Sequence, residues 1–270
     1  MHVQEELGPL PPKPTAETIE EVVNALDSVI AWSITTSSPV GYFAAVYKRI
    51  TIAVMKAADR GDFENGERMK RFDVAFANRY LDALNRHFHD DPDQQLTRAW
   101  RLTFEWAKRP EPIMVQHILG GVNAHIGLDL GIVAEGVARG PELRTLRKDY
   151  STINDILAGE VKGLNVAIYK LSPRLHHHFN PAKGTTIALI NLFLALSRAV
   201  AWAFAVHLAC TPTFLDPAVH SLRDRIVGLQ GSLTYRSFGP MALLVRDIAE
   251  FERRDVAVNI RELDEVASRS

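Results

Sequence analysis

The stretch that decides the fold runs from Pro112 to Ala138 and reads PIMVQHILGGVNAHIGLDLGIVAEGVA. It is mostly apolar, contains no Lys or Arg, and is long enough for about seven helical turns. A glycine in a helix interior costs roughly 0.5 to 1 kcal/mol relative to Ala, so we expect close packing or function to compensate. The glycines are Gly120, Gly121, Gly127, Gly131 and Gly136. The stretch therefore predicts a central helix against which other helices pack closely.

Three polar side chains of this helix share one face. At 100° per residue, His117, His125 and Asp129 fall within about 120° of the helix surface, whereas Gln116 and Asn123 point toward other neighbours. A His and a carboxylate at i and i+4 can chelate one divalent ion. The same pair could instead form a metal-free catalytic or binding cluster. It could also be a structural hydrogen bond that fixes the imidazole tautomer.

Composition limits the class of protein. With 270 residues, 47% of them apolar, the chain can bury one large core. A net charge of -1 and a pI near 6.8 give no electrostatic basis for binding nucleic acid. Cys210 is the single cysteine, which excludes a disulfide framework and a Cys-rich zinc site. The first residues lack the pattern of a signal peptide, so we expect a cytoplasmic protein.

The most apolar segment, residues 185–210, reads TTIALINLFLALSRAVAWAFAVHLAC and has the length of a membrane span. Asn191, Arg198 and His207 interrupt it, and an Arg near a bilayer centre costs at least about 2.5 kcal/mol. We therefore expect no membrane insertion, and a central helix that is buried on all sides.

Hydrophobic periodicity, helix caps and Pro or Gly stops predict the remaining elements. The expected helices cover residues 17–32 after an N-cap at Thr15, 39–60, 65–88, 94–109, 143–171, 216–231, and 240–257 with a last turn to Val266. No stretch alternates like a strand. The predicted fold is all-α, a single-domain bundle (15–270) around the buried Gly-rich helix, after a Pro-rich leader (1–14) with little to pack.

Two polar segments invite functional interpretations that their residues do not support. HDDPDQQ, residues 89–95, is compared with the DDxxD magnesium motif of terpene synthases, but Pro92 breaks the helix that such a motif needs. A loop in which Asp91 or Asp93 caps the next helix is the better interpretation. The adjacent histidines at 176–178 project in different directions, which favours a solvated loop.

Two charged residues lie on apolar helix faces. Asp73 interrupts the apolar stripe of the 65–88 helix, where an unpaired carboxylate is expensive to bury. It either bonds to an Arg, Tyr or His of a facing helix, or it binds a metal or does acid–base work. Arg198 needs an acidic partner, which Asp73, Asp129 or Asp149 could supply.

Four motifs resemble a family of helical proteins of unknown function, DUF5995: RFDVAFANRYLDAL, QHILGGVNAHIGLDLG, DYSTINDIL and SRAVAWAFA. The resemblance covers residues 40–255 and implies a single all-helical domain, with little about activity. The residues on the family pattern are Asp73, Asn78, Arg79, Tyr80, His117, Asn123, His125, Asp129, Asp149, Asn154, Arg198 and Trp202.

The pair His125-xxx-Asp129, together with His117, is also similar to the HxxxD and HxxxE ligand pairs of zinc-dependent phospholipase C. Those enzymes need several such pairs, and only one is visible here, so a trinuclear centre is not expected. The likeness implies at most one divalent metal, Zn or Mg, bound by His117, His125 and Asp129, with Asp73 as a further ligand. Such an ion would activate water.

These observations lead to one functional hypothesis and two alternatives. The hypothesis is an enzyme acting on a phosphoester or other anionic small molecule in the bundle core, and a homo-oligomer is compatible with it. The alternatives are an isoprenoid or natural-product cyclase, and a non-catalytic ligand-binding or scaffold protein. The expected catalytic residues are His125, Asp129, Asp73 and Arg198. The expected substrate-binding residues are Tyr42, Arg79, Tyr80, Asn123, Asp149, Asn154 and Trp202.

Overall fold

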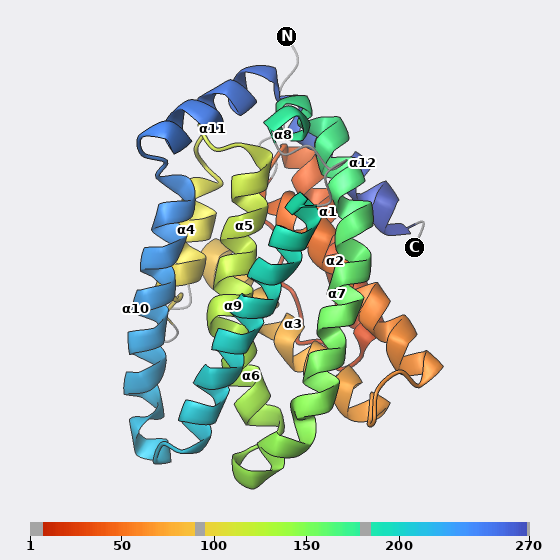
Figure 1. Cartoon of the computed structure of the whole chain (residues 1–270), viewed down its shortest axis with the longest axis vertical. Coiled ribbons are helices and arrows are strands. Elements are labelled where there is room, and N and C mark those ends of the chain that lie inside the picture. The colour runs from red at the N-terminus through yellow and green to blue at the C-terminus, as the bar shows by residue number, and fades with distance from the viewer. Residues whose placement is uncertain (1–7, 90–94, 179–184, 269–270) are drawn as a thin grey trace.

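The computed structural model describes residues 8–89, 95–178 and 185–268 (Figure 1). Within these ranges every regular element is helical and no strand occurs, so the predicted all-α single domain is confirmed. The helices are α1 (Ile19–Thr36), α2 (Val40–Arg60), α3 (Gly66–Phe88), α4 (Arg98–Trp106), α5 (Met114–Ala124), α6 (Leu130–Val137), α7 (Leu143–Leu171), α8 (Pro173–His178), α9 (Thr185–Ala209), α10 (Asp216–Tyr235), α11 (Pro240–Phe251) and α12 (Val256–Ser268).

The predicted central helix is present as α5, a π-helical turn at His125–Asp129, and α6, which follow one another without a break. Figure 1 shows this rod in the middle of the molecule, with α4 and α10 beside α5 and with α9 crossing it. Close packing is what its glycines permit. A Cβ on Gly131 would lie 2.6 Å from the Phe204 ring, and a Cβ on Gly121 would overlap the ring of Phe43.

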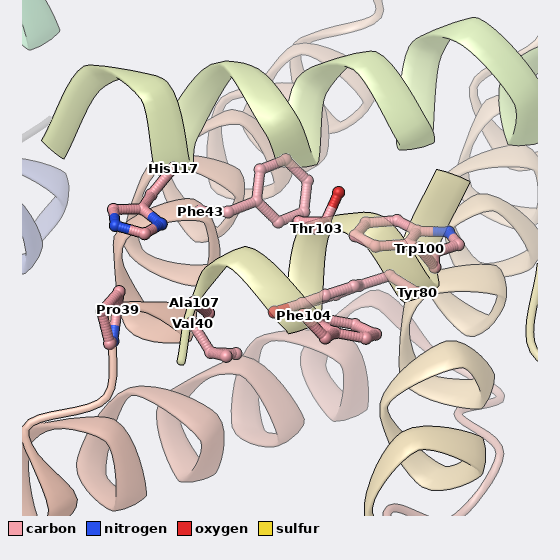
Figure 2. Close-up of a pocket in the computed structure, with 9 residues that line it drawn as sticks. All are labelled: Pro39, Val40, Phe43, Tyr80, Trp100, Thr103, Phe104, Ala107 and His117. Atoms are coloured by element: carbon pink, nitrogen blue, oxygen red, sulfur yellow. The ribbon is translucent and has the colours of Figure 1, made fainter. Parts of the chain in front are cut away.

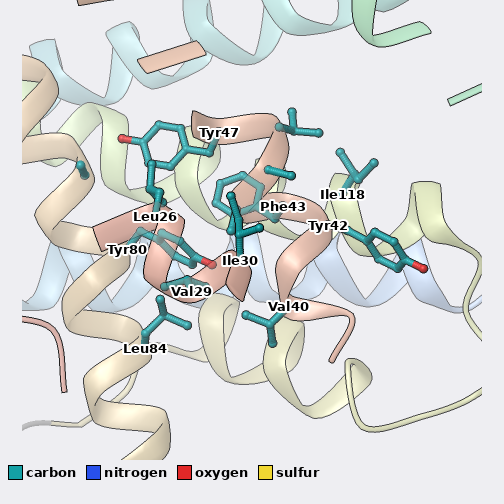
Figure 3. Packing of buried hydrophobic residues seen from close by; sticks show 14 of the residues in the cluster. Leu26, Val29, Ile30, Val40, Tyr42, Phe43, Tyr47, Tyr80, Leu84 and Ile118 are labelled. Carbon is teal, nitrogen blue, oxygen red and sulfur yellow. The ribbon is translucent and has the colours of Figure 1, made fainter. Parts of the chain in front are cut away.

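The core gathers around α2, which packs against α1, α3, α5, α7 and α12. Tyr42, Phe43 and Tyr47 of α2 are all buried, and Figure 3 shows them among aliphatic side chains from neighbouring helices. Its start and end follow the sequence signals closely. Pro39 lies at the N-cap, and Gly61 ends the helix with a left-handed φ of 79°.

The N-terminal leader packs more than predicted. Leu10 is 1% exposed, and its segment runs along α3. There the Lys13 amide donates to Asn85 Oδ1 at 2.8 Å and the Ala16 amide to Asn78 Oδ1 at 2.9 Å. The prediction that the leader has little to pack was therefore wrong for its described part. The first helix is capped by Thr18 and not by Thr15.

The prediction that the 185–210 helix is buried on all sides was wrong. Only 28% of the Ile190–Ala209 window of α9 is buried, and Leu192 and Phe193 are each more than half exposed. By length and composition this window and Met114–Val137, which is 67% buried, could each cross a membrane. That test is also passed by core helices of soluble proteins, so the absence of membrane insertion stays a prediction.

Other differences concern helix ends. The fourth helix is shorter than expected: it starts at Arg98 and ends at Trp106. The C-terminal 240–257 helix is two helices, α11 and α12, separated by residues 252–255. The expected solvated loop at 176–178 is the end of α8, where His178 Nε2 lies 2.7 Å from Asp247 Oδ2. The proposed caps Asp91 and Asp93 lie outside the described residues.

Candidate functional site

The His125–Asp129 pair lies on the π-helical turn of the central rod. This turn contains one extra residue, and the Leu130 amide bonds to the carbonyl of His125, five residues earlier. π-turns inside α-helices are rare and often occur at functional sites. As the i, i+4 spacing predicted, the two side chains meet, with His125 Nδ1 3.4 Å from Asp129 Oδ2.

Asp129 is the centre of a buried polar network. Its side chain is 0% exposed, and it accepts hydrogen bonds from Trp100 Nε1 at 2.8 Å and from Arg79 Nε at 3.1 Å. Burial alone would raise the pKa of this carboxyl, but the Arg79 guanidinium, the His125 imidazole and the Trp100 indole together hold its pKa below the ordinary value. Asp129 is therefore an anion at neutral pH. Arg79, whose side chain is 32% exposed, carries the network to the surface.

His125 lies in an aromatic cage. Its ring stacks on Phe76 at 3.5 Å between centroids, and the ring of Tyr47 stands edge-on at 4.6 Å. Burial lowers the pKa of His125 despite the opposing effect of Asp129, so the imidazole is neutral. With Nδ1 directed at Asp129, Nε2 has no hydrogen-bond partner among the described residues.

Asp73 is a second buried carboxyl with the opposite electrostatics. Burial raises its pKa to about 7, and its Oδ2 has no hydrogen-bond partner in the described parts of the chain. It lies one helical turn before Phe76, and its charge contributes to the raised pKa of Tyr47, so it is close to the cage. The Tyr80 hydroxyl, one turn after Phe76, is also without a partner within the described ranges. Unpaired polar atoms of this kind are uncommon in folded proteins.

The cavity beside this region is small (Figure 2). It has a volume of about 10 Å³, roughly enough for one water molecule. Tyr80, Trp100 and His117 line it, whereas His125 does not. His117 lies against the rings of Tyr42 and Tyr235, and burial lowers its pKa to about 4. Among the described residues, this cavity therefore does not extend to His125.

The residues predicted as metal ligands are not assembled into a ligand set. Among the described residues, no group of three or more His, Cys, Asp or Glu side chains is arranged to hold a metal ion. His117 lies two turns before His125 and faces Tyr42, and Asp129 already accepts bonds from Arg79 and Trp100. A His–carboxylate pair alone supplies too few ligands for a protein zinc site.

Asp149 and Arg198 lie apart from the His125 cage. Asp149 accepts bonds from the amides of Glu64 and Asn65 and from Arg68, so it fixes the start of α3. Arg198, predicted to need a carboxylate, instead donates to Asn154 Oδ1 and to the carbonyl of Tyr150, both at 2.7 Å. The prediction that Asp73, Asp129 or Asp149 supplies an acidic partner for Arg198 was therefore wrong.

The remaining predicted binding residues hold helices together. Asn123 donates to the Val227 carbonyl of α10 at 3.0 Å, Tyr42 accepts from Asn259 of α12 at 3.3 Å, and Trp202 packs on Tyr150. Of the predicted site residues, the structure brings together His125, Asp129, Arg79, Tyr80 and Asp73.

Sequence reasoning missed Tyr47 and Trp100. Both occupy buried positions of amphipathic helices, where an aromatic residue looks like ordinary core. The indole N–H of Trp100 gave the available signal, because a buried Trp usually needs an acceptor and Asp129 is a buried acceptor.

The sequence comparisons name a family and no activity. Residues 19–236 match the family model described as "Family of unknown function (DUF5995)". The chain belongs to this family. No curated protein and no solved structure matches the chain. Family membership therefore agrees with the resemblance of the four motifs, and the chemistry has to be argued from the site.

Proposed function

We propose that this DUF5995 protein is an enzyme in which His125 acts as a general base on a small molecule, oriented by Asp129. The observation that carries the proposal is the buried, neutral imidazole whose Nδ1 faces a carboxylate while Nε2 is left without a partner. In this tautomer Nε2 offers a lone pair, as in the His–Asp pairs of hydrolases. Catalytic contacts are often long in free enzymes, which is compatible with the 3.4 Å separation.

The surroundings favour a small, largely apolar substrate with one ionisable group. Aromatic rings line the His125 cage, and Arg79 supplies a positive charge at its outer end. Asp73, with a pKa raised to about 7, could return a proton after His125 has taken one. A substrate would enter only if side chains around the cage move, since the adjoining cavity holds about one water.

Metal-dependent phosphoester hydrolysis, which the His–Asp spacing suggested, has less support. It would need a third ligand that the described residues do not bring to His125 and Asp129. Elemental analysis of tag-free protein, beside a His125→Ala, Asp129→Ala variant, tests it. A stoichiometric metal that disappears in the variant would restore this hypothesis.

A second candidate is a non-catalytic scaffold, in which the network only fixes the register of the helices. The small volume of the cavity and the hydrogen bonds that Asp129 accepts from Trp100 and Arg79 favour it. Buried polar networks can serve such a purpose without chemistry.

The variant His125→Phe separates the two candidates, because phenylalanine matches the aromatic cage but has no base. A library of small carboxylic acids, esters and phosphoesters is screened by thermal shift with the wild type, His125→Phe, and His117→Gln as the control. For an enzyme, we expect compounds that raise the Tm of the wild type and of His117→Gln but not that of His125→Phe. If no compound discriminates the variants, the general-base proposal fails and the scaffold is favoured.

A further inference from the structure

The outward face of α10 carries a narrow apolar seam. Leu222, Ile226, Leu229 and Leu233 recur at spacings of four, three and four residues, and they are between 43% and 67% exposed. This is the spacing of a coiled-coil seam, in which side chains of two helices interlock. The opposite face of α10 is already used, since Val227 is fully buried.

The helix before it, α9, presents a second apolar stripe. Leu192, Phe193, Leu196 and Val200 are between 48% and 57% exposed. The only charged residue of α9 is Arg198, which is 3% exposed and points into the core. Between Leu192 and Val200, the exposed face of α9 therefore carries no Asp, Glu, Lys or Arg.

These two helices flank the same central rod. α9 packs on α6 and the π-turn, and α10 packs on α4 and α5. They touch where the Phe204 ring lies 6.4 Å from the His220 ring, and Figure 1 shows them diverging from their connection at one end of the molecule. Leu119 of α5, the helix on which α10 packs, is also 37% exposed. The exposed apolar side chains of α9 and α10 thus belong to neighbouring helices.

The exposed apolar area of these side chains is comparable to the largest patch that a monomer usually exposes. Fully burying a Val, Leu, Ile or Phe side chain removes roughly 100 Å² of apolar area from water, so eight that are about half exposed offer on the order of 400 Å². The largest apolar patch on an ordinary monomer is about 300–600 Å². Each partner of a standard protein interface contributes about 800 Å². Because a little over half of such an interface is apolar, the apolar area of these side chains is close to what one partner contributes.

We propose that the face formed by α9 and α10 binds a second copy of this chain. An uncharged seam is compatible with its own symmetry mate, because neither copy brings a charge that the other must neutralise. The alternation of Ile226 with leucines suits helix pairing. Lipid fits less well, because the exposed Arg225 and Gln230 flank the seam and would have to leave water.

The test is the mass of the full chain in solution by light scattering after gel filtration, at about 1 to 50 µM. We expect a particle of twice 30.1 kDa for the wild type. Leu222→Glu combined with Leu229→Glu should weaken association by about 30-fold or more per position and give a monomer. An independent pair on α9, Leu192→Glu with Leu196→Glu, should act in the same direction. Circular dichroism and Tm establish that each variant is folded.

Val166→Glu is the matched control, because Val166 is 71% exposed and belongs to α7 and not to either of the two helices. It should leave the mass at the dimer value. A wild type that is monomeric at 50 µM, folded seam variants that remain dimeric, or dissociation by Val166→Glu would each overturn the proposal. Flotation of monomeric wild type with phosphatidylcholine vesicles would do so too, and would identify lipid as the occupant.

Discussion

At the scale of single residues, two buried carboxyls show how environment separates the roles of identical groups. Asp129 and Asp73 are both buried, yet the pKa of Asp129 is lowered and that of Asp73 is raised to about 7. The difference comes from partners: Arg79 and Trp100 donate to Asp129, whereas Asp73 Oδ2 has no partner among the described residues. Pairs of titratable groups with pKa values pushed apart are typical of acid–base sites.

The network around Asp129 should be essential for stability. Asp129→Asn keeps the size of the side chain but removes the charge that Arg79 and Trp100 share. We expect the free energy of unfolding to fall by about 2–4 kcal/mol, measured by urea denaturation. Asp155→Asn, at an exposed position of α7, is the control and should change it by less than about 0.5 kcal/mol. Equal effects would mean that the buried network contributes little.

Asp73 should make the protein less stable as pH rises. In the unfolded chain the pKa of Asp73 is near its ordinary value of 3.8, whereas in the folded chain it is about 7, so stability decreases between these pH values and the loss is complete above 7. Asp73→Asn removes this contribution. Between pH 4 and 8 we expect the variant to gain at least about 2 kcal/mol relative to the wild type.

Buried histidines change the stability of the fold with pH in the opposite direction to Asp73, so wild type and variant have to be compared at each pH. His117, with a folded pKa of about 4, contributes stability above its unfolded value that is lost as pH falls toward 4. Urea unfolding of wild type, Asp73→Asn and the exposed control Asp155→Asn at each pH isolates the contribution of Asp73. Parallel pH profiles for wild type and Asp73→Asn would show that Asp73 ionises normally.

At the scale of elements, the sequence predicted the close packing of helices better than it predicted how much of each helix is exposed. The glycines of the central helix indicated close contacts, and Gly121 and Gly131 have them. The π-turn could not be predicted, because its extra residue only shifts the helical phase by about 100°, and that shift leaves little trace in a stretch that is mostly apolar. The exposure of α9 was also hidden, since an apolar helix has the same sequence whether a core, a partner or nothing covers it.

The central helix offers a matched pair of glycine substitutions. A Cβ on Gly121 would overlap the Phe43 ring, whereas a Cβ on Gly136 would meet nothing within 4 Å. We expect Gly121→Ala to lower the free energy of unfolding by about 1–3 kcal/mol despite the better helix propensity of Ala. Gly136→Ala should raise it by up to about 1 kcal/mol. Chemical denaturation measures both, and a stabilising Gly121→Ala would show that α2 and α5 can move apart.

At the scale of the whole molecule, the folded unit extends past both ends of the family match. The match ends at residue 236, yet Ile260 and Leu263 of α12 are fully buried against α1 and α2. At the other end, Leu10 is buried before the match begins at residue 19. The sequence predicted a single domain but placed the leader outside it, because Pro-rich segments without periodicity carry no signal of burial.

If the leader belongs to the cooperative unit, Leu10→Ala should destabilise the entire fold. Leu10 is 1% exposed in the cluster that also holds Leu26 and Leu84, and removing a buried Leu side chain costs about 2–5 kcal/mol. We expect a loss near 2–3 kcal/mol in urea unfolding followed by far-UV circular dichroism, with one transition. Leu243→Ala, at a 70% exposed position of α11, should have almost no effect. An unchanged midpoint for Leu10→Ala would mean that the leader detaches before the bundle unfolds, and that the cooperative domain starts at α1.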